Sequence, residues 1–161
     1  MILLFKIGAI VCCAIIAVQD VKERAVQWIW FPLLGLVLSL LYLQNTPLEH
    51  YLLFALTNAL LVSLILVLLA LYTKYIAKKT FMNVSFGLGD LLFFYAFALG
   101  FPTFTFVLLF VAAILFSFLV FLLKSPRKEG GTVPLAGLMG VFLIGVFLIS
   151  CIPNMPSLYL L

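Results

Sequence analysis

The sequence of 161 residues is 67% apolar and only 9% charged, with a net charge of +4. Soluble domains carry roughly a quarter charged residues, so this composition excludes an ordinary soluble domain and indicates an integral membrane protein. Basic residues in such a protein orient it in the bilayer, and we therefore expect no nucleic-acid partner. No polar stretch is long enough for a separate soluble unit. Residues 1–161 are expected to form a single membrane domain.

Five apolar runs approach the ~20 residues that a helix needs to cross the hydrocarbon core, and a sixth, the fourth along the chain, is short. They predict an all-α membrane protein with six transmembrane helices, at about residues 2–18, 26–43, 51–72, 89–99, 104–123 and 135–152. The first run lacks the basic segment and cleavage site of a signal peptide, so we expect it to be the first span. Pro32 is expected to kink the second span.

The basic residues indicate how the chain is oriented. Eight of the nine lie between spans one and two, three and four, or five and six: Lys22, Arg24, Lys74, Lys78, Lys79, Lys124, Arg127 and Lys128. The positive-inside rule places these connections in the cytoplasm and both termini outside it. Lys6 is the exception. The expected location is the inner (plasma) membrane.

Two aspartates stand at the cytoplasmic ends of predicted spans. Asp20 ends the first span, and Asp90 begins the fourth. An ionisable carboxyl at such a position is a candidate functional group. Gly87 and Gly89 precede Asp90; they allow close approach of another backbone and also permit a positive φ. The alternative for Asp90 is a simple helix cap that accepts backbone N–H groups.

Facing carboxyls in a partly dry site share a proton and titrate as a coupled pair. The ionised member takes a proton from water, which attacks a peptide carbonyl, while the protonated member donates to the developing oxyanion. The placement of Asp20 and Asp90 at one depth therefore predicts aspartic peptidase chemistry.

Other chemistries find less support in the sequence. The one histidine, His50, is expected on the outer side, a bilayer away from Ser85, which excludes a Ser–His hydrolase. No H-E-x-x-H motif is present, and the cysteines lack zinc-site spacing, so no metal and no cofactor are expected. Cys12, Cys13 and Cys151 are interpreted as small packing residues.

Two segments resemble known motifs. Gly87-Leu88-Gly89-Asp90 resembles the G-x-G-D motif of intramembrane aspartyl proteases. Residues 20–26, D-V-K-E-R-A-V, resemble the D-x-[KR]-x-[KR]-x-[IV] segment of the type IV prepilin peptidase family. The order of the motifs and the six-span layout are similar to that family over essentially the whole chain. The stretch Thr132-Val133-Pro134-Leu135-Ala136 resembles the family's proline-containing entry to the last helix.

The resemblance implies that Asp20 and Asp90 are the catalytic pair and that Gly87 and Gly89 shape the second motif. It also implies a substrate: a type IV prepilin or pilin-like protein, whose short basic leader is cut on the cytoplasmic side of its hydrophobic helix. The lipid bilayer is the other expected partner.

The chain departs from the family pattern at several points. Gln27 stands where proline is frequent, and Leu92 where lysine is frequent. The N-terminal methyltransferase region with its cysteine tetrad is absent, so N-methylation of the product is not expected. Glu23 and Glu129 are hypothesised to meet the positive charge of a leader.

Three alternatives stay open. The first alternative is a protein without catalytic activity, in which the aspartates are helix caps. It would be an inactive homologue, or a chaperone or assembly component of a pilus or secretion system. A small proton-coupled transporter is disfavoured, because carriers place their sites near the midplane and both acids lie near one face. The presenilin and signal peptide peptidase group is the more distant enzyme family.

Overall fold

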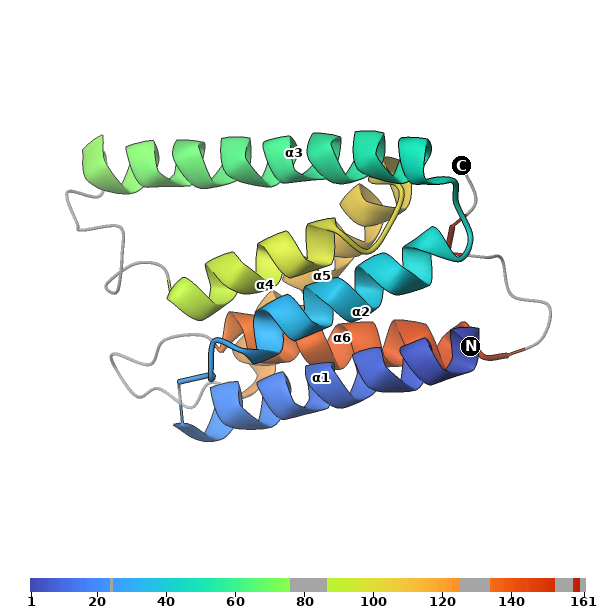
Figure 1. The fold of residues 1–161 in the computed structure, drawn as a ribbon. Coiled ribbons are helices and arrows are strands. Elements are labelled where there is room, and N and C mark those ends of the chain that lie inside the picture. The colour runs from blue at the N-terminus through green and yellow to red at the C-terminus, as the bar shows by residue number, and fades with distance from the viewer. Residues whose placement is uncertain (24, 76–86, 125–133, 153–157, 160–161) are drawn as a thin grey trace.

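The computed structural model describes residues 1–23, 25–75, 87–124, 134–152 and 158–159, which form six α-helices and no strand (Figure 1). The helices are α1 (Ile2–Glu23), α2 (Trp30–Leu43), α3 (Leu48–Tyr75), α4 (Leu88–Ala98), α5 (Thr103–Lys124) and α6 (Leu135–Ile149). The predicted all-helical fold is confirmed. In the described chain α1, α3 and α5 are long and apolar enough to cross a membrane, and α2, α4 and α6 are shorter apolar helices. These features indicate a membrane protein. Six spans and the orientation of the termini stay predictions.

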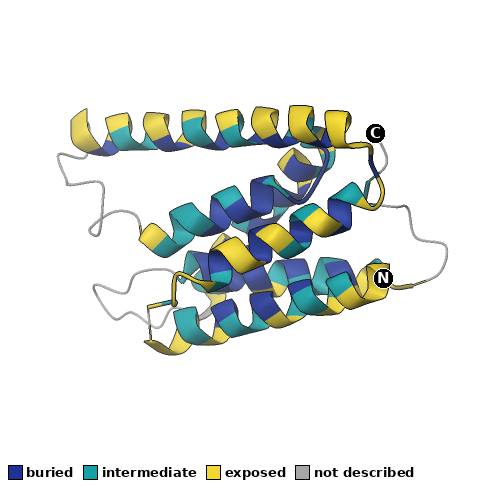
Figure 2. Ribbon diagram, in the orientation of Figure 1, coloured by how far each residue is buried: buried dark blue, intermediate teal, exposed yellow. Residues whose placement is uncertain are grey.

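The helices bring together chain segments that are far apart in sequence. α1 begins and α6 ends at one end of the bundle, whereas α1 ends and both α4 and α6 begin at the other (Figure 1). α1 packs mainly on α6 and α2, α6 also packs on α5, and α2 packs on α4. α3 runs along the edge with its outward face exposed (Figure 2). The candidate site lies at the end of the bundle where α4 and α6 begin.

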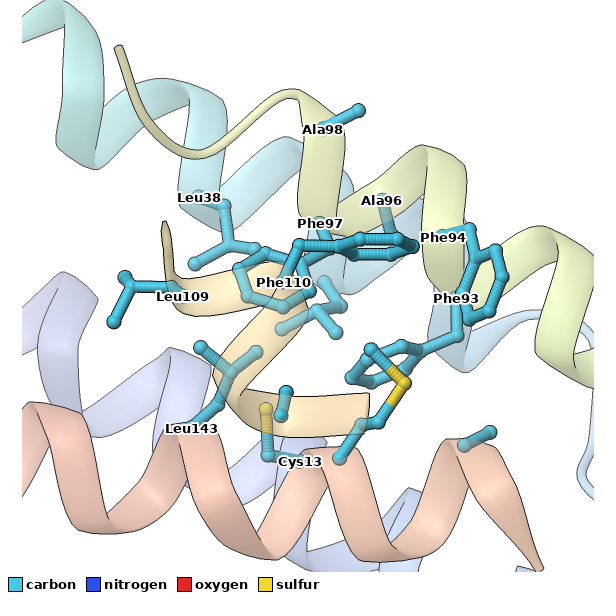
Figure 3. Packing of buried hydrophobic residues seen from close by; sticks show 14 of the residues in the cluster. Cys13, Leu38, Phe93, Phe94, Ala96, Phe97, Ala98, Leu109, Phe110 and Leu143 are labelled. Atoms are coloured by element: carbon cyan, nitrogen blue, oxygen red, sulfur yellow. The ribbon is translucent and has the colours of Figure 1, made fainter. Parts of the chain in front are cut away.

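The core around α4 is aromatic. Phe93, Phe94 and Phe97 of α4 are buried together with Phe110 of α5 (Figure 3). The rings of Phe94 and Phe110 meet edge to face with their centroids 4.8 Å apart, a favoured aromatic geometry. Because α2, α3, α5 and α6 all contact α4, this helix is apolar on every side rather than along one stripe.

Small residues allow α1 and α6 to approach closely. Ala9, Cys13 and Ala17 are buried at four-residue spacing on α1. On α6, a methyl group added at Gly140 would lie 3.2 Å from the carbonyl oxygen of Cys13. Small residues at four-residue spacing are typical of helix contacts in membranes, because they let backbones meet. This close contact fixes the end of α1 against the start of α6.

Two predicted boundaries were wrong. α1 continues through the polar residues to Glu23, and α2 begins at Trp30 rather than near residue 26. The backbone N–H of Gln27 donates to the side-chain oxygen of Gln19 (3.1 Å), so Gln27 lies beside the end of α1. Pro32 lies in the first turn of α2, where a helix has no partner for the missing N–H. The expected kink at Pro32 is therefore also wrong.

Lys6, the basic residue outside the charge pattern, has a local role. Its ammonium group donates to the carbonyl oxygen of Ser150 (2.9 Å), immediately after α6. Carbonyls at a helix C-terminus lack intrahelical partners and interact favourably with cations. Lys6 therefore ties the start of α1 to the end of α6.

The cysteines differ in burial. Cys12 and Cys13 are buried in α1, as their interpretation as packing residues requires, and both are free thiols. Cys151 follows α6 and is exposed, so that interpretation is wrong for Cys151.

Asn58 on α3 is a fully buried polar residue that holds the end of α4. Its amide donates to the carbonyl oxygens of Ala98 (3.0 Å) and Phe101 (2.9 Å). Because a buried carbonyl without a partner costs roughly 1–3 kcal/mol, Asn58→Leu is expected to lower the free energy of unfolding by about that amount. Thermal unfolding in detergent measures the effect.

Asn45 provides the matched control for this substitution. It is exposed, and its side-chain amide donates to the carbonyl of Leu41, one turn earlier in the chain (2.9 Å). Asn45→Leu is expected to change stability by less than about 0.5 kcal/mol. Equal destabilisation by the two substitutions would argue against a special role of Asn58.

Candidate active site

Asp20 and Asp90 meet at the first turn of α6. The backbone N–H of Gly137 donates to Oδ2 of Asp20 (2.6 Å), and that of Ala136 donates to Oδ1 of Asp90 (2.8 Å). The two amides are consecutive, so the two carboxyls lie side by side, and the charge on Asp20 acts on Asp90. The expectation that these two side chains lie close together agrees with this geometry. Their catalytic role stays a prediction.

The start of α6 suits this arrangement physically. The first N–H groups of a helix have no intrahelical partners and carry partial positive charge. The residue before α6 is Pro134, which makes no side-chain cap. Carboxyls from α1 and α4 bind these N–H groups instead. Three helices that are distant in sequence are thereby joined at one point.

Asp90 also interacts with its own helix. It is the third residue of α4, which begins after Gly87, and its carboxyl interacts with the Gly87 backbone. The helix-cap interpretation of Asp90 is therefore compatible with the geometry. The same carboxyl reaches α6 as well, which a simple cap of α4 does not require.

The glycines of the second motif provide space rather than an unusual backbone. A methyl group at Gly87 would lie 3.2 Å from Oδ2 of Asp90, and one at Gly89 would lie 3.3 Å from Cζ of Phe31. Gly87 has a φ of −77°, and no glycine in the described segments has a positive φ. The atoms that crowd these glycines belong to side chains, whereas another backbone was expected from the sequence. A left-handed backbone is not needed.

Gly137 belongs to the site and was not predicted. A methyl group there would lie 3.0 Å from both Cβ and Oδ2 of Asp20 and 3.3 Å from the carbonyl oxygen of Ala17. The lack of a side chain at Gly137 therefore lets the Asp20 carboxyl reach the helix N-terminus. The signal in the sequence was a pair of glycines, Gly137 and Gly140, in the first turns of the last apolar run.

The surroundings of the carboxyl pair are half open. Asp20 and Asp90 are both partly exposed, and the residues that end α1 are exposed, including Glu23. Glu23 lies one turn beyond Asp20 and is exposed, and its contact with a basic leader stays a prediction. Glu129 and Ser85 lie outside the described residues. Of the other predicted residues, His50 is in the first turn of α3, at the opposite end of the bundle (Figure 1).

Within the described segments, no three His, Cys, Asp or Glu side chains are grouped so that they could hold a metal ion. The polar groups that the described residues bring together at the site are the two carboxyls and the first backbone N–H groups of α6.

Comparison of the chain with family models, with curated proteins and with solved structures found no match. The fold and the site together define a class: a helical protein with membrane-length apolar helices and a pair of carboxyls at one end of the bundle. The particular activity is inferred from that pair and from the two motifs.

Proposed function

We propose that this protein is a membrane aspartic endopeptidase that cleaves the basic leader of type IV prepilin-like proteins at the cytoplasmic face of the membrane. The observation that carries the proposal is the pair of hydrogen bonds from consecutive α6 amides to Asp20 and Asp90. An arrangement that holds two carboxyls side by side is what general acid and base catalysis by such a pair requires.

In this mechanism two backbone N–H groups of α6 orient the carboxyls, and each of them binds one oxygen of one carboxyl. The pair carries one proton. The ionised member removes a proton from a water molecule, and the resulting hydroxide adds to the scissile carbonyl carbon. The protonated member donates its proton to the carbonyl oxygen. Collapse of the tetrahedral intermediate breaks the C–N bond. The departing nitrogen receives the proton that the base removed, and one hydroxyl of the intermediate returns a proton to the carboxyl that donated one, which leaves the product acid and restores the singly protonated pair.

The second candidate is a non-enzymatic assembly component. The same hydrogen bonds favour it, because they also satisfy the start of α6 and join α1, α4 and α6 without any chemistry. The half-open surroundings of the carboxyls suit both candidates, because a peptidase needs access to its acids and a helix cap gains nothing from burying its charge.

Cleavage of a precursor distinguishes the two candidates. The protein is reconstituted in liposomes with a prepilin-like precursor that carries a basic leader and a hydrophobic helix, and the products are identified by mass spectrometry. We expect a single cut at the junction of the leader and the helix. Stable binding of intact precursors, with no cut in a panel of leaders, would favour the assembly component.

A further inference from the structure

Leu158 and Tyr159, which follow α6 in the chain, lie at the end of the bundle opposite to the carboxyl pair (Figure 1). Both pack on the buried core, and the ring of Tyr159 fills a socket between Tyr42 of α2 and Phe101, which stands between α4 and α5. We propose that these two residues form a detachable strap, and that the socket accepts another phenol ring when Tyr159 leaves it. The inference does not depend on the proposed function.

The ring of Tyr159 is held by stacking on two other rings. Its centroid lies 5.6 Å from that of Tyr42 and 6.0 Å from that of Phe101, with interplanar angles of 23° and 10°. Aromatic pairs at centroid separations of about 4.5–7 Å attract one another beyond the effect of the area they bury. Tyr159 therefore joins the end of α2 to the connection between α4 and α5.

The walls of the socket have supports of their own. Tyr42 and Phe101 are fully buried. Tyr42 meets the ring of Tyr51 of α3 edge to face, with centroids 5.4 Å apart, and Phe101 stacks on Phe147 of α6 at 6.2 Å. The carbonyl oxygen of Phe101 also accepts the amide of Asn58. Because both walls are fixed by other contacts, the socket is expected to keep its shape when the strap leaves.

The hydroxyl of Tyr159 opposes docking of the strap. Its oxygen is buried, and no group in the described chain is hydrogen bonded to it. A buried hydroxyl without a partner loses the hydrogen bonds that water offers it outside. Stacking therefore favours the docked ring while the hydroxyl disfavours it, and the docked and released positions lie close in free energy. That balance is what makes the strap detachable.

Removal of the ring tests the socket. Tyr159→Ala is expected to lower the unfolding temperature of the purified protein by about 5 °C or more, because it leaves a ring-sized cavity. Added p-cresol, which is the tyrosine side chain without its backbone, is expected to restore about half of that loss by mass action. The wild-type protein, whose socket is filled, should not be stabilised. No loss in the variant, or an equal response of both proteins to p-cresol, would overturn the proposal.

Two matched variants identify the ring as the cause. Tyr159→Phe keeps the ring and removes the hydroxyl, so its unfolding temperature should equal or exceed that of the wild type. Tyr72→Ala removes a ring that is 54% exposed on α3, and it is expected to have little effect. Rescue of Tyr72→Ala by p-cresol, or destabilisation by Tyr159→Phe, would contradict the socket.

Fluorine NMR tests detachment in a protein that keeps the ring. With 3-fluorotyrosine at position 159 we expect a major signal from the docked ring and a minor signal from the released ring, and p-cresol should enlarge the minor one. The docked share should not change on dilution, because the strap and the socket belong to one chain. A single signal that ignores p-cresol would show a permanent contact and overturn the strap. A docked share that falls on dilution would assign the ring to a second copy of the chain, which also overturns it.

Discussion

Asp90→Asn is expected to reduce the rate of precursor cleavage by about 10³-fold or more while the protein remains folded. The asparagine carbonyl oxygen can still accept the N–H of Ala136, which now donates over 2.8 Å. The amide neither takes nor gives a proton at neutral pH, and general acid and base catalysis contributes roughly 10²–10⁴-fold. Asp20→Asn is expected to act in the same way through the N–H of Gly137.

Asparagine is the informative substitution because it separates the two roles of each carboxyl. It preserves the cap on α6 and removes the acid–base function. Single-turnover cleavage in liposomes measures the rate, and thermal unfolding shows whether the fold is kept. Glu49→Gln, which neutralises an acid in the first turn of α3 at the other end of the bundle, is the control. Cleavage at the wild-type rate by either aspartate variant would falsify the assigned chemistry at that residue.

Gly137→Val is expected to lower both stability and activity. Its Cβ would lie 3.0 Å from Oδ2 of Asp20 and 3.3 Å from the carbonyl oxygen of Ala17, so α1 and α6 must separate. Overpacking of this kind costs roughly 1–3 kcal/mol. Displacement of a catalytic group by about 1 Å can cost about 10²-fold in rate, and we expect a loss of that size.

The same helix provides the control for this substitution. Gly145 of α6 has open space where a Cβ would be, with no other atom within 4 Å. Gly145→Val is expected to leave cleavage unchanged and to alter the unfolding temperature only slightly. If the two variants lose activity equally, the effect comes from valine in α6 rather than from the contact with Asp20.

The six described helices could be predicted from hydropathy because each lies in an apolar run, although only three of them are long enough to cross a membrane. Their ends could not, since helix formation does not stop where apolarity stops. α1 runs on through Gln19 to Glu23, although these residues are polar. α2 begins late because the segment before Trp30 is held in a turn by Gln19, a long-range effect that composition does not reveal.

The site could be predicted in part. Charged side chains are rare in this chain, so Asp20 and Asp90 stood out. The groups that hold them are backbone amides of Ala136 and Gly137, and a backbone amide has no signature in a sequence. Asn58 could have been singled out in the sequence as an isolated polar residue in a long apolar run. Its partners could not have been predicted, because they are backbone carbonyls at and just after the end of α4.

If α2 crosses the membrane as predicted, the lipids beside it meet a helix of 14 residues, about 21 Å long, whereas the hydrocarbon core of a bilayer is ~30 Å thick. Such a mismatch is relieved when neighbouring acyl chains shorten or tilt and the leaflet thins locally. Thinning on this flank would draw the headgroup region toward the end of the bundle that carries Asp90. Membrane thickness itself would then set how easily water reaches the two acids.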